Sequence, residues 1–265
     1  MSSTATGFYT RIKYTPAGEL LSIEHANRPI FKRKSVFDDL RKEETKPGAK
    51  WDPDGIPAEA GEGNEDNARR AVNRAKVRAF DFIMCNPDLD AFATLTLDGE
   101  RIERTSYDAV YHRLRGWLSN RVQRQGLKYI MCPEYHKDGQ SIHFHMLANA
   151  GALNLIEART PGGYLMRRKG KPVYNLSDWD LGFSTAQLIP PTDGREAVAK
   201  YIFKYMGKQT GARIGGRYFL HGGDLASPVE ELCDVIPPAL QALPEAFRSE
   251  FSLGEGFEYQ KRYYL

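Results

Sequence analysis

The sequence is poor in cysteine and has no long apolar stretch. Its 265 residues include 3 cysteines, and none of them forms a C-x-x-C pair. This spacing argues against a disulfide framework or a structural zinc site and indicates reduced thiols in a reducing compartment. No apolar stretch approaches the about 20 residues of a membrane-spanning helix, so we expect no membrane partner. The first residues also lack the charged start and apolar run of a secretory signal, which predicts a cytoplasmic protein.

Neither sign of charge dominates the chain. Lysine and arginine number 37 and aspartate and glutamate 34, and the resulting net charge of +3 permits a nucleic-acid partner without requiring one. The basic residues are clustered, for example at 167–171 and 200–208. A single cluster of this kind is most often a solvated face, so it gains meaning only beside other motifs.

Composition divides the chain into three parts. Residues 1–64 are rich in Gly, Pro, Glu and Lys and have weak periodicity, so we expect a mostly irregular segment. Residues 65–222 carry regular patterns and are expected to form the functional domain. Residues 223–265 form a mixed, Pro-containing tail that either packs against the domain or has an accessory role.

Periodicity in the middle part predicts an α+β domain. Helical spacing occurs at 64–82, 105–125 and 195–208, and strand alternation at 91–97, 128–135 and 141–148. Asp138-Gly139 between the last two strands is a strong hairpin signal. Further strands are possible up to residue 189.

This hairpin carries a candidate metal site. His143 and His145 are two residues apart in a strand, so both imidazoles leave the same face of the sheet. If Asp138-Gly139 forms a two-residue turn, Glu134 lies directly opposite His143. Two imidazoles and one carboxylate leave open coordination positions, which suits Mn²⁺ or Mg²⁺ acting as a Lewis acid on a phosphodiester. Cys132, opposite His145 in this register, is a weaker candidate for the fourth ligand of a zinc site.

The predicted helix 195–208 repeats Tyr-x-x-Lys in tandem, beginning at Tyr201 and at Tyr205. Its apolar residues form one arc, its lysines occupy the opposite side, and both tyrosines lie on the boundary. A phenol there can be held by the core and still face a polar groove, with a lysine near for a phosphate. Tyrosine suits a nick that must be resealed, because the aryl phosphodiester conserves the energy of the broken bond. An isolated Tyr-x-x-x-Tyr, however, is most often a pair of core residues.

Three segments, taken in order, resemble the three motifs of the HUH endonuclease superfamily. They are Phe92-Ala-Thr94-Leu-Thr96, then His143-Phe-His145 with the upstream Glu134, then Tyr201-Ile-Phe-Lys204-Tyr205. Within the superfamily, the paired tyrosines look like the replication initiators of small single-stranded DNA phages and related phage or plasmid Rep proteins. The resemblance spans residues 66–210.

The resemblance implies a fold and a metal site. The fold is an antiparallel sheet with the histidine strand central and the tyrosine helix packed nearby. His143 and His145 become metal ligands and Glu134 the third ligand, with His136 on the same hairpin face as its rival.

It also implies a reaction. Tyr201 and Tyr205 are the candidate nucleophiles, and Lys204 and Lys208 assist at the phosphate. The attack nicks single-stranded DNA, leaves a 5′-phosphotyrosine link and a free 3′ hydroxyl, and initiates rolling-circle replication. Further candidates for DNA contacts are Thr94, Thr96, Arg167, Arg168, Lys169 and Lys200.

The implied partners are single-stranded DNA or an origin hairpin, in the cytoplasm of a bacterial host. No Gly-x-x-x-x-Gly-Lys-Ser/Thr phosphate loop occurs, so unwinding falls to a host helicase and synthesis to a host polymerase. One alternative is a single-tyrosine transposase or relaxase of the same superfamily. Another, of a different class, is a non-catalytic single-strand-binding module, because stacking aromatics and basic grooves need no nucleophile.

Overall fold

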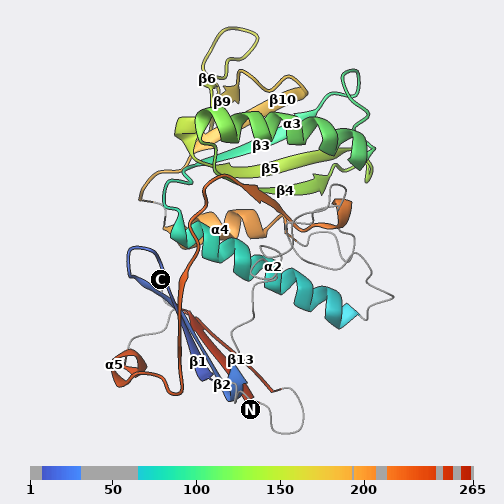
Figure 1. Cartoon of the computed structure of the whole chain (residues 1–265). Coiled ribbons are helices and arrows are strands. Elements are labelled where there is room, and N and C mark those ends of the chain that lie inside the picture. The colour runs from blue at the N-terminus through green and yellow to red at the C-terminus, as the bar shows by residue number, and fades with distance from the viewer. Residues whose placement is uncertain are drawn as a thin grey trace. The chain divides into compact units, whose positions relative to one another are not determined.

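The computed structural model describes residues 8–30, 65–192, 194–206, 214–242, 247–252 and 258–263, and every structural statement below concerns these residues. The chain forms two compact units (Figure 1). One unit is Asn64–Ser227, and the other combines Met1–Gly63 with Pro228–Leu265. Within the described ranges, no helix has the length and apolar character needed to cross a membrane.

The unit Asn64–Ser227 is built on a 7-stranded antiparallel sheet with the order β11-β4-β5-β3-β10-β9-β6. The strands are β3 (Ala91–Leu97), β4 (Tyr129–Tyr135), β5 (Ile142–Ala148), β6 (Leu155–Glu157), β9 (Tyr174–Leu176), β10 (Gly182–Leu188) and β11 (Leu220–Gly222). A small hairpin of β7 (Arg167–Arg168) and β8 (Lys171–Pro172) stands apart from this sheet. The expected α+β fold is confirmed, with the histidine strand β5 inside the sheet between β4 and β3.

Helices cover both faces of this sheet. Figure 1 shows α3 (Tyr107–Gln125) on one face, and α2 (Glu65–Cys85) with α4 (Arg195–Phe203) on the other. Strand alternation explains the division, because successive side chains of a strand point to opposite faces. The side chains of β3 that join Val110 and Leu114 of α3 in one core are Ala91, Ala93, Leu95 and Leu97. Phe92, Thr94 and Thr96 therefore point to the other face, which carries the histidines.

Helix α3 begins and ends where its sequence predicts. The side chain of Ser106 accepts a hydrogen bond from the amide of Ala109, and Gly126 ends the helix with a φ of 67°. The last residue in particular must adopt a left-handed conformation that glycine adopts without strain.

Helices α2 and α4 pack against each other and against β4 and β5. Ala79 and Ile83 of α2 join Val198 and Ile202 of α4 in one apolar cluster. At the edge of this cluster the guanidinium of Arg195, the first residue of α4, donates hydrogen bonds to the backbone of the α2 C-terminus. The carbonyl oxygens of Asn86, Ile83 and Leu89 lie 2.8, 2.9 and 3.1 Å from its nitrogens. Arg195 therefore fixes the start of α4 to the end of α2.

Helix α4 is shorter than the expected segment 195–208. It ends at Phe203, and the amide of Tyr205 donates to the carbonyl of Ile202 in a tighter, three-residue bond of 3.0 Å. The amide of Met206 still reaches the carbonyl of Ile202, at 3.3 Å, so Tyr205 stays on the same helical turn. The following residue, Gly207, has a low helix propensity, which explains the early end.

The second unit differs from what we expect of the two termini. Its 5-stranded sheet has the order β12-β1-β2-β14-β13. The strands are β1 (Phe8–Tyr14), β2 (Leu20–Ile30), β12 (Val229–Cys233), β13 (Phe247–Ser252) and β14 (Glu258–Tyr263), and a short helix α5 (Pro238–Gln241) follows β12. Residues 8–30 are thus paired strands where an irregular segment is expected, and the C-terminal segment is part of a sheet. Residues 31–64 lie outside the described ranges.

The physical reason is that this sheet joins opposite ends of the chain. β1 pairs with β12, and β2 pairs with β14. Ile12, Ile23 and Ile236 make its small apolar core, so each terminal segment contributes only part of the core. A local pattern read within either segment alone is therefore weak.

Candidate metal centre and tyrosine site

The β4–β5 hairpin has the predicted register. Glu134 pairs with His143, and Cys132 pairs with His145. The turn is longer than the predicted two-residue turn, because the amide of His136 already donates to the carbonyl of Ser141, at 2.7 Å, and the loop is 137–140. A symmetric lengthening of the loop leaves the pairing of the strands unchanged.

Asp138 holds this loop together. Its carboxylate accepts hydrogen bonds from the hydroxyl of Ser141 and from the amides of Gln140 and Ser141, both at 2.9 Å. These bonds lower the pKa of Asp138 to about 2. The ionised side chain therefore stabilises the loop that aligns Glu134 with His143.

Glu134, His143 and His145 form a group that can hold a metal ion. The Nε2 atom of His145 lies 2.8 Å from Oε2 of Glu134 and 3.0 Å from Nε2 of His143. The third distance, from Nε2 of His143 to Oε2 of Glu134, is 3.3 Å. Only 12, 12 and 9% of the side chains of Glu134, His143 and His145 is exposed to solvent.

The spacing of these three atoms fits a six-coordinate ion. Ligands about 2.1 Å from an ion lie about 3.0 Å apart at neighbouring corners of an octahedron and about 3.4 Å apart in a tetrahedron. The observed distances of 2.8, 3.0 and 3.3 Å lie nearer to the octahedral value. One carboxylate and two imidazoles thus offer three neighbouring positions and leave the others for water or phosphate oxygens.

Thr94 of β3 supports the group from the neighbouring strand. It pairs with His145, and its hydroxyl oxygen lies 3.2 Å from Nδ1 of that histidine. An Nδ1–H that donates to this hydroxyl fixes the ring and leaves the Nε2 lone pair free for an ion. Thr96 pairs with His143 in the same way along the strand. These threonines, which we expect to contact DNA, therefore lie directly beside the histidines.

The two alternative ligands have different surroundings. Cys132 is fully buried in the apolar cluster under α2 and α4, and burial raises the pKa of its thiol above the usual range. The ring of His136 lies 4.3 Å from that of His143, but His136 is outside the three-residue group. Among the described residues, Glu134 is the one that completes the group with the two histidines.

The two tyrosines lie against the same face of the sheet. The ring of Tyr205 stacks on His145, with 3.6 Å between centroids and 20° between planes. Phe92 of β3 lies between the rings, with its centroid 5.3 Å from Tyr201, 5.9 Å from Tyr205 and 5.8 Å from His145. Tyr201 is 56% exposed, whereas Tyr205 is half-buried. The fold thus brings the second and third motif segments together around a residue of the first.

Residues 90–210 match the family model of replication-associated proteins of the ORF2 type. The match runs from the start of β3 past the end of α4, so it contains the metal group and both tyrosines. It supports a replication-associated protein. No curated protein and no solved structure matches the chain.

The basic candidates lie at different distances from the tyrosines. The Nζ atom of Lys204 is 5.8 Å from the centroid of the Tyr205 ring. Lys200 is exposed on the same helix. Lys208 lies outside the described residues.

Arg167, Arg168 and Lys169 form the exposed β7–β8 hairpin, which turns through Lys169 and Gly170 with φ values of 53° and 76°. The side-chain amide of Gln187 in β10 donates to the carbonyl of Arg168, at 3.3 Å. The basic hairpin is therefore fastened to the strand next to β3.

Sequence reasoning missed one exposed aromatic residue on the face of the metal group. Phe183 of β10 pairs with Thr96, which in turn pairs with His143. Its side chain is 73% exposed, and the next residue along the same face, Thr185, is exposed too. The signal is weak because β10 mixes small and polar residues, so its pattern does not predict a definite strand.

Proposed function

We propose that the unit Asn64–Ser227 is a metal-dependent endonuclease that nicks single-stranded DNA with a tyrosine nucleophile and initiates rolling-circle replication. The observation that carries the proposal is the stacking of Tyr205 on His145, at 3.6 Å. It sets a phenol beside a group of residues that can hold an ion. The match to a replication-associated family supports the same function.

Glu134, His143 and His145 would hold the ion, and Mn²⁺ or Mg²⁺ would neutralise charge on the phosphate oxygens as a Lewis acid. Thr94 keeps the His145 ring in one orientation through the contact of 3.2 Å at Nδ1. The low exposure of the group restricts water around the phosphate and strengthens the electrostatic interactions there.

In the reaction a phenolic oxygen bonds to the phosphorus of the scissile phosphodiester, and the bond from phosphorus to the 3′ oxygen breaks. The phenol loses its proton to solvent, and the 3′ oxygen takes up a proton and leaves as a hydroxyl. The ammonium group of Lys204, near the Tyr205 ring, attracts the phosphate and stabilises the negative charge that develops on it. No co-reactant is consumed, so the 3′ hydroxyl can later reverse the step and reseal the strand.

The single strand would cross the open part of the sheet beside the metal group. Phe183 offers a surface on which a base can stack, and the arginines of the β7–β8 hairpin offer contacts for phosphates. A host helicase would expose the strand, and a host polymerase would extend the free 3′ hydroxyl. The runner-up function is a transposase or relaxase of the same chemistry that uses a single tyrosine; Tyr205 is then the better candidate because it contacts His145.

The proposal is tested by incubating the full chain with circular single-stranded DNA and Mn²⁺ and resolving the products on a denaturing gel. We expect a covalent protein–DNA adduct and a free 3′ end that a polymerase extends. EDTA and the Tyr201→Phe/Tyr205→Phe double variant serve as controls and should give no adduct. Binding of the DNA without any adduct, across several origin-containing circles, would favour the non-catalytic single-strand-binding module.

A further inference from the structure

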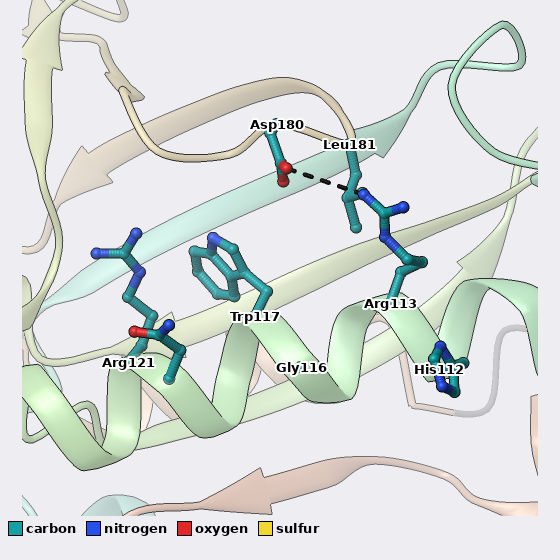
Figure 2. A pocket seen from close by; sticks show the side chains of 8 residues that line it. His112, Arg113, Gly116, Trp117, Arg121, Asp180 and Leu181 are labelled. Atoms are coloured by element: carbon teal, nitrogen blue, oxygen red, sulfur yellow. Dashed lines mark ion pairs between the residues drawn. The ribbon is translucent and has the colours of Figure 1, made fainter.

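A cavity of about 320 Å³ lies on the outer side of α3, which covers the face of the sheet opposite the metal group. Figure 2 shows it between α3 and the loop that carries Asp180 and Leu181. None of the motif residues lines it. The cavity is therefore separate from the site described above.

The floor of the cavity is Gly116, in the interior of α3. Glycine destabilises the interior of a helix relative to alanine. Gly116 has no positive φ, and a Cβ added there would meet no atom within 4 Å. Neither the backbone nor the packing of the described chain therefore requires glycine. Its missing side chain leaves the cavity open down to the helix backbone, as a ligand that approaches closely would need.

Trp117 forms a rigid wall next to this floor. Its Nε1 donates to the carbonyl of Asp178, at 3.0 Å, and its ring meets that of Trp179 edge-on, with 5.2 Å between centroids. The guanidinium carbon of Arg121 lies 5.7 Å from the centroid of the Trp117 ring, and Arg121 is itself fixed by Asp178 at 2.5 Å. The indole is thus held in place before any ligand binds.

Arg113 lies on the other side of Trp117 and is weakly engaged. It forms a long ion pair with Asp180, at 3.9 Å, and the side chains of the two residues are 57 and 69% exposed. Figure 2 shows Trp117 between Arg113 and Arg121, with Asp180 across the cavity. A ligand phosphate can replace the distant carboxylate at Arg113 with little loss.

These features together suit a nucleotide. A flat aromatic surface flanked by guanidinium groups is the arrangement on which bases of a single strand stack, whatever their sequence. The volume is at the small end of ligand pockets, about 300–1,000 Å³, so it accommodates one nucleotide of a strand. Two more exposed arginines, Arg115 and Arg124, lie on the same helix, which has one acidic residue, Asp108.

We propose that this cavity binds one nucleotide of single-stranded DNA, with the base on Trp117 over Gly116 and the phosphate at Arg113. The choice of DNA as the ligand rests on the proposed function; the cavity itself does not. Because the cavity and the metal group are on opposite faces of one sheet, the unit would hold a second segment of DNA while the first is nicked. Such a contact retains the circle between the first and the last cut.

The test fills the cavity without disturbing the core. Gly116→Leu places a side chain in open space and replaces a poor helix former, so the variant should fold at least as well as the wild type. Ser119→Leu, at an exposed position of the same helix, is the matched control. Arg113→Glu, also exposed, removes the phosphate contact independently.

Each protein is irradiated with an oligothymidylate that carries 5-iodouracil, and the crosslinked peptides are mapped. We expect a crosslink at Trp117 in the wild type and in Ser119→Leu, and a loss of about 10-fold in Gly116→Leu and Arg113→Glu, the size expected for one stacked base. Formation of the covalent adduct on a short origin strand should be unchanged in all three variants.

A wild-type crosslink at Trp117 that persists in Gly116→Leu, or none at Trp117 at all, overturns the inference even when the tyrosine adduct forms. Competition of the crosslink by a polyglutamate peptide as effectively as by unlabelled oligothymidylate would show a site for acidic protein segments instead. Failure of the proposed function has a different signature, because the tyrosine adduct is then absent whatever happens at Trp117.

Discussion

The ring of Tyr205 lies flat against the imidazole of His145, with 3.6 Å between their centroids and 20° between their planes. The two residues belong to the α4 segment and to β5, which are far apart in the sequence and meet on one face of the sheet. A phenol in this place cannot shift along the sheet without losing the stacking contact. The nucleophile candidate is therefore positioned by a residue that is itself a candidate ligand.

The histidines should be essential for nicking and not for folding. We expect His143→Ala and His145→Ala each to lower the adduct yield by at least about 100-fold, because each removes a ligand. His145→Ala should also lower the melting temperature more than His143→Ala, since His145 is buried and stacks on Tyr205. Adduct yield and thermal unfolding measure the two effects. A folded double variant that still cuts and still needs metal would put the ion elsewhere.

Glu134 should tune the demand for metal. We expect Glu134→Ala to raise the Mn²⁺ concentration needed for half-maximal cutting more than it lowers the rate at saturating Mn²⁺, because two imidazoles still bind the ion weakly. His136→Ala is the matched control, from the same hairpin, and should leave the Mn²⁺ titration nearly unchanged. The opposite pattern would make His136 the third ligand while leaving the register of the hairpin intact.

Asp138 should stabilise the hairpin in a pH-dependent way. Its pKa is lowered to about 2 in the folded protein, so its contribution is fully present above the unfolded pKa of 3.8 and is lost as the pH falls toward 2. We expect the melting temperature of Asp138→Ala to be lower than that of the wild type by a constant amount at pH 5–7. The gap should close at lower pH. Lys137→Ala, at an exposed position of the same loop, should show no such dependence.

Local sequence signals predicted the part of the fold whose partners are close in the chain. The strand 91–97, the helix ending at Gly126 and the Glu134–His143 register were all confirmed. Each depends on short-range alternation, on a cap or on a hairpin. The terminal sheet was missed because β1 finds its partner β12 at the other end of the chain.

The candidate site was predicted in part for the same reason. The hairpin fixes the metal group locally, so sequence reasoning reached it. The central position of Phe92, between Tyr201, Tyr205 and His145, depends on how α4 packs on β3. Packing between distant elements leaves no periodic trace in the sequence, and neither does the exposure of Phe183.

Arg195 should position α4 without taking part in the chemistry. We expect Arg195→Ala to destabilise the protein by about 2–4 kcal/mol, because it leaves several backbone carbonyls at the end of α2 without their donor. The adduct should form more slowly while Mn²⁺ affinity, measured by electron paramagnetic resonance, stays unchanged. Lys200→Ala, at an exposed position of the same helix, controls for the loss of a positive charge. An equal loss of Mn²⁺ affinity in Arg195→Ala would show a general disturbance of the sheet.

The two tyrosines should divide the labour of two cuts. Tyr201 and Tyr205 are one helical turn apart, about 6 Å along the axis, and both rings contact Phe92. An initiator cuts once to start and again after a round of synthesis, and a second tyrosine allows the second cut while the first is still bonded to DNA. Tyr201, which is more exposed, can turn toward the same phosphate by side-chain rotation.

We therefore expect either single Tyr→Phe variant to form an adduct on a short single-stranded origin, and the double variant to form none. Tyr205→Phe should be the slower of the two single variants, because Tyr205 is the one that lies against His145. Peptide mapping of wild-type adducts should find DNA on both residues. If Tyr205→Phe alone abolishes the adduct and mapping finds DNA only on Tyr205, a single nucleophile acts and the transposase or relaxase alternative becomes the better account.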